Sequence, residues 1–157
     1  MTRSDAFALL CRLALAAVFV AAACAKIADP AAFALAVSRY HILPGALINV
    51  AAIGLPWVEL FAGLALLLPA ATPSLRRFRL GALLVVAAML STFTVAIAHL
   101  LLQGQTASCG CFSTRADASS SNAFNIVRNV LLLAAAAFAA AADARRAAAR
   151  PRLEVPR

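Results

Sequence analysis

The residues best suited to chemistry in this chain are two cysteines one residue apart, Cys109 and Cys111, with Gly110 between them. They lie in the interval 103–125, the longest polar interval between two apolar runs. A disulfide between cysteines so close in sequence closes a very small ring, departs from relaxed geometry and is easily reduced. Gly110 supplies the backbone freedom that such a ring demands. The pair is therefore a candidate for a labile or catalytic disulfide.

Spacing alone leaves other interpretations of this pair open. For an isolated Cys-x-Cys, the more common case is two unpaired loop thiols, or one thiol joined by a disulfide to another part of the chain, here Cys24 in span one. Two thiolates also suit Cu(I). The chain has two histidines and no methionine near the motif, which counts against copper, and we predict no metal site.

Composition predicts an integral membrane protein. Of 157 residues, 64% are hydrophobic and 13% are charged, and the mean hydropathy is +0.92. Soluble domains are nearer half apolar and a quarter charged. The net charge of +8 does not indicate nucleic-acid binding, because the basic residues lie between and after apolar runs, where they report orientation in the membrane.

The apolar runs predict an all-α fold, a four-helix bundle that spans the membrane. A span needs about 20 residues of helix, and the expected spans are about 6–26, 46–68, 78–102 and 124–142. The first is long enough if Arg12 extends its guanidinium to the interface; the alternative is a cleaved signal peptide. Asp29-Pro30 opens a short interfacial helix between spans one and two. Residues 143–157 form a basic cytoplasmic tail.

Counting of Lys and Arg predicts the orientation. Basic residues gather at the start of the chain, between spans two and three (Arg76, Arg77 and Arg79) and after span four. These regions share one side, so both termini are expected in the cytoplasm of a bacterial inner membrane. The Cys109-Gly110-Cys111 loop then faces the periplasm, an oxidising compartment in which cysteines can exchange disulfides.

Other residues near the expected periplasmic end are candidates to support this chemistry. Cys24 is the candidate resolving thiol. Lys26 and Arg128 are cations that can lower the pKa of a nearby thiol, although Lys26 can equally extend to the interface, and Arg128 with Asn129 can simply cap span four. His99 is a candidate proton shuttle, and its plain alternative is a solvated interfacial side chain.

Glu59 is an ionisable residue well inside span two, and such residues are costly in lipid and mark functional sites by default. Its candidate partners are Lys26, Arg128 and backbone groups freed by Pro56. We favour a buried polar clasp between spans, and the alternative is a proton or quinone site coupled to the thiols.

The chain resembles the methylamine-utilisation protein MauE family, within the wider DoxX-like group of small four-span membrane proteins. The resemblance covers Arg12 to about Leu133. The pieces that carry it are Arg12, Phe19 and Lys26; Asp29-Pro30, Phe33 and 40–44; 55–59; 109–112; and Arg128-Asn129. Ser113 departs from the family, which usually has Gly there, and this puts the turn beyond the cysteines in doubt.

The resemblance implies a membrane factor that matures a periplasmic, disulfide-rich client such as the methylamine dehydrogenase light subunit. It also implies a periplasmic thioredoxin-like partner. Two functions follow as hypotheses: a thiol-disulfide oxidoreductase that works through Cys109 and Cys111, with a membrane quinone as its candidate cofactor, or a non-catalytic assembly factor that docks the thioredoxin-like partner. A transporter is not expected, because the spans hold few polar residues and no internal repeat is evident.

Overall fold

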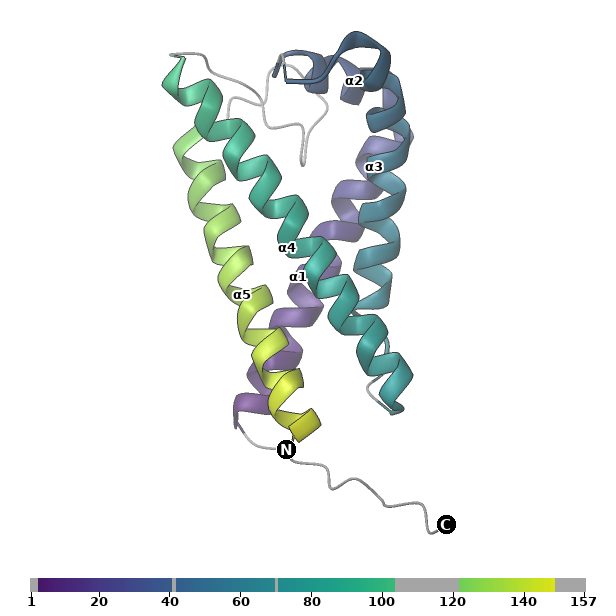
Figure 1. Cartoon of the computed structure of the whole chain (residues 1–157), viewed down its shortest axis with the longest axis vertical. Helices are drawn as coiled ribbons and strands as arrows, with labels where there is room; N and C mark the ends of the chain where they lie inside the picture. The colour runs from purple at the N-terminus through teal and green to yellow at the C-terminus, as the bar shows by residue number, and fades with distance from the viewer. Residues whose placement is uncertain (1–2, 41, 70, 104–121, 149–157) are drawn as a thin grey trace.

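The computed structural model describes residues 3–40, 42–69, 71–103 and 122–148, and all regular structure among them is helical. Figure 1 shows the helices in chain order. They are α1 (Arg3–Ala28), α2 (Pro30–Ser38), α3 (Gly45–Ala65), α4 (Pro73–Leu102) and α5 (Asn122–Ala148). The predicted all-α class is confirmed.

Among the described residues, α1, α3, α4 and α5 are long and apolar enough to cross a membrane. The shortest of these four helices, α3, has 21 residues and is about 32 Å long, which is enough to cross a hydrocarbon core of about 30 Å. The outer faces of these helices expose large apolar side chains, as lipid contact requires. Examples that are more than half exposed are Val50, Phe61, Phe78, Leu84 and Leu102. The four-span membrane bundle is therefore confirmed.

Two of the helix starts follow directly from local sequence. Asp29 precedes Pro30, and its Oδ1 accepts a hydrogen bond from the Ala32 amide at 3.0 Å, as an N-cap residue does. Thr72 and Pro73 repeat the arrangement at α4, where Thr72 Oγ1 accepts from the Leu75 amide at 3.3 Å. Capping thus fixes where α2 and α4 begin.

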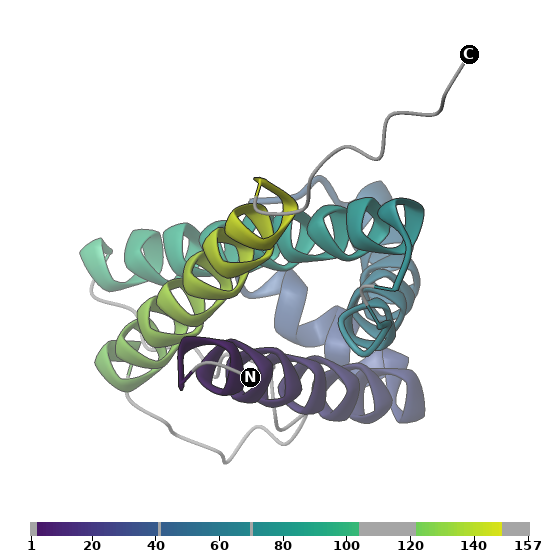
Figure 2. The same cartoon turned by 90° about the horizontal axis from the view of Figure 1, so that it is seen from below.

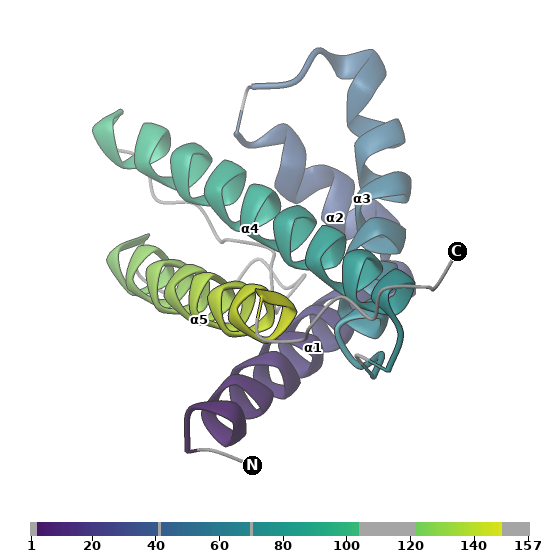
Figure 3. The same cartoon turned by 60° about the horizontal axis from the view of Figure 1, so that its bottom comes forward.

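The helices close around one core. α1 packs mainly against α3, α4 packs mainly against α5, and α5 also lies along α1. Seen from below, α1 and α4 lie on opposite sides of the bundle, and α3 and α5 close the other two sides (Figure 2). Figure 3 shows α5 between α4 and the first half of α1.

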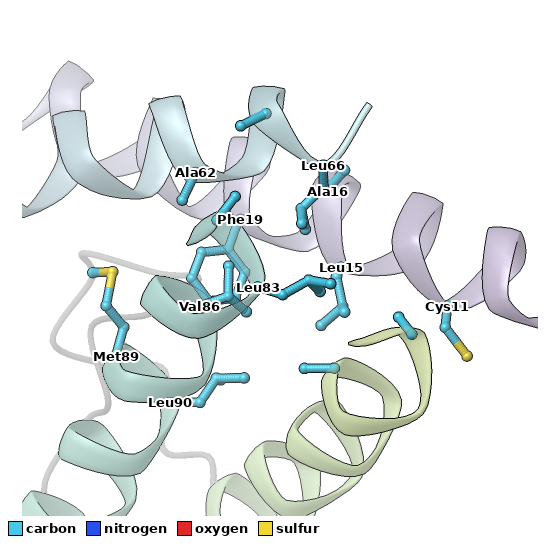
Figure 4. Close-up of a cluster of buried hydrophobic side chains, with 14 residues drawn as sticks. Cys11, Leu15, Ala16, Phe19, Ala62, Leu66, Leu83, Val86, Met89 and Leu90 are labelled. Carbon is cyan, nitrogen blue, oxygen red and sulfur yellow. The ribbon is translucent and has the colours of Figure 1, made fainter. Parts of the chain in front are cut away.

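The centre of the bundle is filled by apolar side chains from all four long helices (Figure 4). Leu15 and Phe19 of α1 meet Leu83 and Val86 of α4, while α5 contributes small residues such as Ala139. Lipid tails are as apolar as this core, so helix association depends on close packing, which small residues permit. Cys11 belongs to this core, as expected of a small apolar residue.

The α2 helix lies over one end of the bundle, against α3 and α1 (Figure 1). We call this the α2 end. The last turn of α1, the end of α4 and the start of α5 are at the same end, whereas the start of α1, the start of α4 and the end of α5 are at the opposite end (Figure 1). The interval 104–121 therefore joins two helices at the α2 end.

Two helices extend beyond the expected spans. α4 begins at Pro73, so Arg76, Arg77 and Arg79 belong to a spanning helix rather than to the link before it. α5 continues past residue 142 to Ala148, because Asp143 is buried and paired within the bundle instead of starting a tail. Residues 149–157 of the predicted tail lie outside the described part of the chain.

Candidate functional site

Lys26 and Glu59 form a buried ion pair between α1 and α3. Lys26 Nζ lies 2.5 Å from Glu59 Oε1 and 2.7 Å from Oε2, so one ammonium donates to both oxygens. The two residues are 1% and 3% exposed. Separating such a pair leaves a charge buried without compensation, at a cost of about 3–5 kcal/mol. We call this pair the Lys26 clasp, since it fastens α1 to α3 as the clasp hypothesis for Glu59 expects.

The interfacial alternative for Lys26 was wrong, because aromatic rings also enclose its ammonium. Nζ lies 5.0 Å from the ring centroid of Phe33 in α2 and 5.3 Å from that of Phe93 in α4. Such cation–π contacts favour a charge that has lost its water. Phe33 is itself buried, so α2 covers the clasp with an anchored side chain rather than only lying across the helix ends.

A small cavity of about 30 Å³ adjoins the clasp. Its polar lining residues are Lys26, Glu59, Arg128 and Asn129, and its apolar lining includes Phe19 and Leu90, which Figure 4 labels. This volume suits about one water molecule. It does not fit a quinone ring, so the quinone hypothesis gains no support from this site. Among the described lining residues, Lys26 and Arg128 are cations and Glu59 is a carboxylate.

Arg128 and Asn129 belong to a polar chain from α5 to α4. Arg128 Nη2 donates to Asn129 Oδ1 at 3.4 Å, and Asn129 Nδ2 donates to Thr94 Oγ1 at 3.3 Å. The Thr94 hydroxyl donates to the Leu90 carbonyl at 2.6 Å. Because α5 begins at Asn122, Arg128 and Asn129 lie well inside it. Their capping interpretation was therefore wrong, and they connect α5 with α4 instead.

Cys24 and His99 do not line this cavity. Cys24 is exposed on α1, and two residues correspond to about 200° of helix rotation, so Cys24 faces away from the side on which Lys26 lies. His99 is exposed, and its Nε2 lies 3.0 Å from the side-chain amide nitrogen of Gln103. Cys109 and Cys111 lie outside the described residues. The structure thus brings together Lys26, Glu59, Arg128 and Asn129.

A second polar group was missed by the sequence analysis. Asp143 of α5 accepts from Arg79 of α4, with Nε to Oδ2 at 2.8 Å and Nη2 to Oδ1 at 2.6 Å. Arg12 Nη1 of α1 is 3.6 Å from the same carboxylate. We call these three buried residues the Asp143 cluster. It lies toward the opposite end of the bundle and joins three helices there.

The expectation that Arg12 reaches the interface was wrong, since its side chain is 8% exposed beside Asp143. The available signal was the helical spacing of α5. Its buried positions are separated by three, four or seven residues, that is, by one or two helical turns, which places Asp143 on the same face. That series is Asn125, Asn129, Ala136, Ala139 and Asp143.

Comparison with known proteins supports the resemblance noted from the sequence. The family model "Methylamine utilisation protein MauE" matches residues 4–142. The chain is 33% identical over 133 residues to "Methylamine utilization protein MauE" of Methylophilus methylotrophus. That alignment covers 84% of this chain and 66% of the relative, just under two thirds of its length. No solved structure matches the chain.

Proposed function

The chain belongs to the MauE family of methylamine utilisation proteins, and we propose that it serves methylamine utilisation by thiol-disulfide exchange. In this proposal Cys109 and Cys111 pass a disulfide between a thioredoxin-like protein and a disulfide-rich client, such as the methylamine dehydrogenase light subunit. Both partners act in the periplasm, and the bundle holds the cysteine loop at the membrane face.

The observation that carries the proposal is where the cysteine interval is attached. Gln103 follows α4 and Asn122 begins α5 at the α2 end (Figure 1). The Lys26 clasp, α2 and the polar chain from Arg128 lie toward the same end. The two thiols are thus tethered to the end of the bundle at which its polar groups join α1, α2, α3, α4 and α5.

The exchange step follows ordinary disulfide chemistry. A client thiolate attacks one sulfur of the Cys109–Cys111 disulfide, the bond between the two sulfurs breaks, and a mixed disulfide forms. The second client thiolate then attacks the mixed disulfide, which forms the client disulfide and releases the pair as a dithiol. Two electrons and two protons pass to Cys109 and Cys111, and an oxidised thioredoxin-like partner takes them up by the reverse steps. The same steps run backwards if the client is reduced instead.

Lys26, Arg128 and Cys24 have different roles in the proposed exchange. Lys26 is balanced by Glu59 at 2.5 Å, so its role in the proposal is to hold α1, α2 and α3 in place. Arg128 lines the cavity, and in the proposal its guanidinium lowers the pKa of a cysteine thiol by proximity. Cys24 stays a candidate resolving thiol only for a partner that approaches α1 from its exposed side.

The proposal is tested by Cys109→Ser and Cys111→Ser in cells that need the client. We expect the client to accumulate with unpaired cysteines, which alkylation of free thiols followed by electrophoresis detects. Cys11→Ala is the matched control, because Cys11 is buried in the core at the opposite half of α1. Normal client maturation in the Cys109→Ser/Cys111→Ser variant would exclude exchange and leave a non-catalytic role in docking the thioredoxin-like partner.

A further inference from the structure

An open groove runs between α3 and α4 on the lipid-facing side of the bundle. It has a volume of about 760 Å³ and lies in the half of the bundle where α4 begins. Its lining residues come from the second half of α3 and the first half of α4, and the two helices diverge from there toward the α2 end (Figure 1). The groove is separate from the cavity beside the Lys26 clasp, with which it shares no lining residue.

The groove is apolar along its length and cationic at one end. Its lining includes the small residues Ala62, Ala65 and Gly81 and the aromatic residues Phe61 and Phe78. Both rings are about two thirds exposed, at 65% and 67%, on helices long and apolar enough to span a membrane. This surface therefore faces acyl chains.

Polar groups gather where α4 begins. Ser74 and Arg77 line this end of the groove, one and four residues after Pro73. Among the described residues, no carboxylate forms an ion pair with Arg77. The ion pairs in the described part of the chain are formed by other arginines and by Lys26. The Arg77 guanidinium and the Ser74 hydroxyl can thus donate to an anion that enters from the membrane surface.

We propose that this groove is a binding site for an anionic phospholipid. One acyl chain lies along Ala62, Ala65 and Gly81, and the phosphate lies against Arg77 and Ser74. The charge pattern selects this occupant, because an apolar groove with one cationic end matches an amphiphile that carries its negative charge at one end. A bound lipid fills the space between α3 and α4, which pack on each other less extensively than α1 packs on α3 or on α5, or α4 on α5.

The chain offers matched variants for a direct test. Arg77→Gln removes the charge in the groove, and Arg76→Gln removes the neighbouring charge, which does not line it. Gly81→Leu places a side chain in the groove, and Gly54→Leu places the same side chain on an exposed face of α3. A Cβ at either glycine meets nothing within 4 Å, so both variants are expected to fold. Circular dichroism in detergent checks that helicity is unchanged.

The experiment uses the purified full chain in neutral detergent, with phosphatidylglycerol and phosphatidylcholine of identical acyl chains as probes. Native mass spectrometry counts the lipids retained. We expect one phosphatidylglycerol to be retained with about fivefold preference over phosphatidylcholine, the effect of about one basic residue near a charged headgroup. Arg77→Gln removes the preference and Arg76→Gln keeps it. Gly81→Leu weakens the binding of both lipids and Gly54→Leu does not.

Three results would overturn the proposal. Equal losses for Arg76→Gln and Arg77→Gln would show a diffuse surface charge rather than a site. Unchanged lipid retention in Gly81→Leu would place the acyl chain elsewhere. A dimer in the wild-type protein that Gly81→Leu converts to monomer would show that a second copy of the chain covers the groove.

Discussion

Lys26 and Glu59 show how a charged pair can be stable at membrane depth. The ammonium donates to both carboxylate oxygens at 2.5 and 2.7 Å, and the rings of Phe33 and Phe93 enclose the rest of it. Unpaired charges are costly in lipid, whereas a pair with complete hydrogen bonding offsets much of that cost. The pair therefore acts as a fastening between helices whose loss affects folding directly.

Removal of one partner of the Lys26 clasp tests this role. We expect Glu59→Gln or Lys26→Met alone to destabilise the fold by about 3–5 kcal/mol, since each leaves the other group buried without its counter-charge. The double variant should recover most of this loss. Helicity followed through a denaturant titration in mixed micelles measures it, and Arg39→Gln at the exposed end of α2 is the control. Single variants as stable as the wild type would contradict the clasp.

Asp143 carries a similar role at the opposite end. It is the one carboxylate within 4.0 Å of Arg12 and Arg79 among the described residues. Asp143→Asn therefore leaves two buried guanidiniums without a counter-charge, and we expect a loss of about 3–5 kcal/mol in the same titration. Asp5→Asn is the matched control. Its pair with Arg146 is 26–38% exposed, and its loss should cost about 1 kcal/mol or less. Equal losses of stability in Asp143→Asn and Asp5→Asn would show that burial of an ion pair does not determine the free-energy cost of breaking it.

At the scale of elements, Gly63 of α3 lies in close contact with α1. A Cβ at Gly63 would lie 3.0 Å from Val20 Cγ2 and 3.3 Å from the Val20 amide nitrogen. Part of that contact is backbone, which has little room to move in a packed core. Glycine at this position is thus required by packing between two helices rather than by a turn.

Alanine substitutions in α3 separate this packing requirement from helix propensity. We expect Gly63→Ala to destabilise the bundle by about 1–3 kcal/mol, as overpacking usually does. Gly54→Ala meets nothing within 4 Å and should be neutral or stabilise by up to about 1 kcal/mol, the propensity difference between Gly and Ala. Thermal unfolding in detergent compares the two variants. A more stable Gly63→Ala protein would show that α1 and α3 can separate freely.

The sequence predicts where helices occur better than it predicts which side chains pair between them. The reason is physical. Length and apolar content decide whether a segment spans a membrane, and both are local, so the four spans and the Asp29-Pro30 start were predictable. The partners of Arg12, Arg79 and Asp143 depend on which helices pack together, which no local pattern contains. Positive charges near span ends were therefore assigned to the interface, although two of them, Arg12 and Arg79, are buried against a shared carboxylate.

At the scale of the whole molecule, polar fastenings toward each end enclose an apolar core. The Lys26 clasp and the polar chain from Arg128 lie toward the α2 end, and the Asp143 cluster lies toward the opposite end. Arg3, Arg76, Arg77 and Arg145 occur where the opposite end meets the surface. This distribution supports the proposed orientation, with that end in the cytoplasm and the α2 end in the periplasm.

Labelling of thiols in intact cells tests the orientation. In a Cys11→Ala/Cys24→Ala background, we expect a membrane-impermeant maleimide to label Cys109 and Cys111 after reduction. A cysteine introduced by Arg145→Cys, in a chain whose natural cysteines are replaced, should be labelled only after the membrane is permeabilised. The reverse pattern would place the cysteine interval in the cytoplasm, where disulfides rarely persist.

Capture of the mixed disulfide tests the exchange through Cys109 and Cys111 most directly. Exchange through Cys109 and Cys111 predicts that Cys109→Ser or Cys111→Ser, in a Cys11→Ala/Cys24→Ala background, retains one thiol that stays bonded to the client or to the thioredoxin-like partner. Acid quenching, alkylation and mass spectrometry of the purified membrane protein should then identify a reducible adduct at the remaining cysteine. The variant that lacks both thiols should carry none. Absence of any adduct from both single variants, while the client still acquires its disulfides, would exclude exchange through these two cysteines.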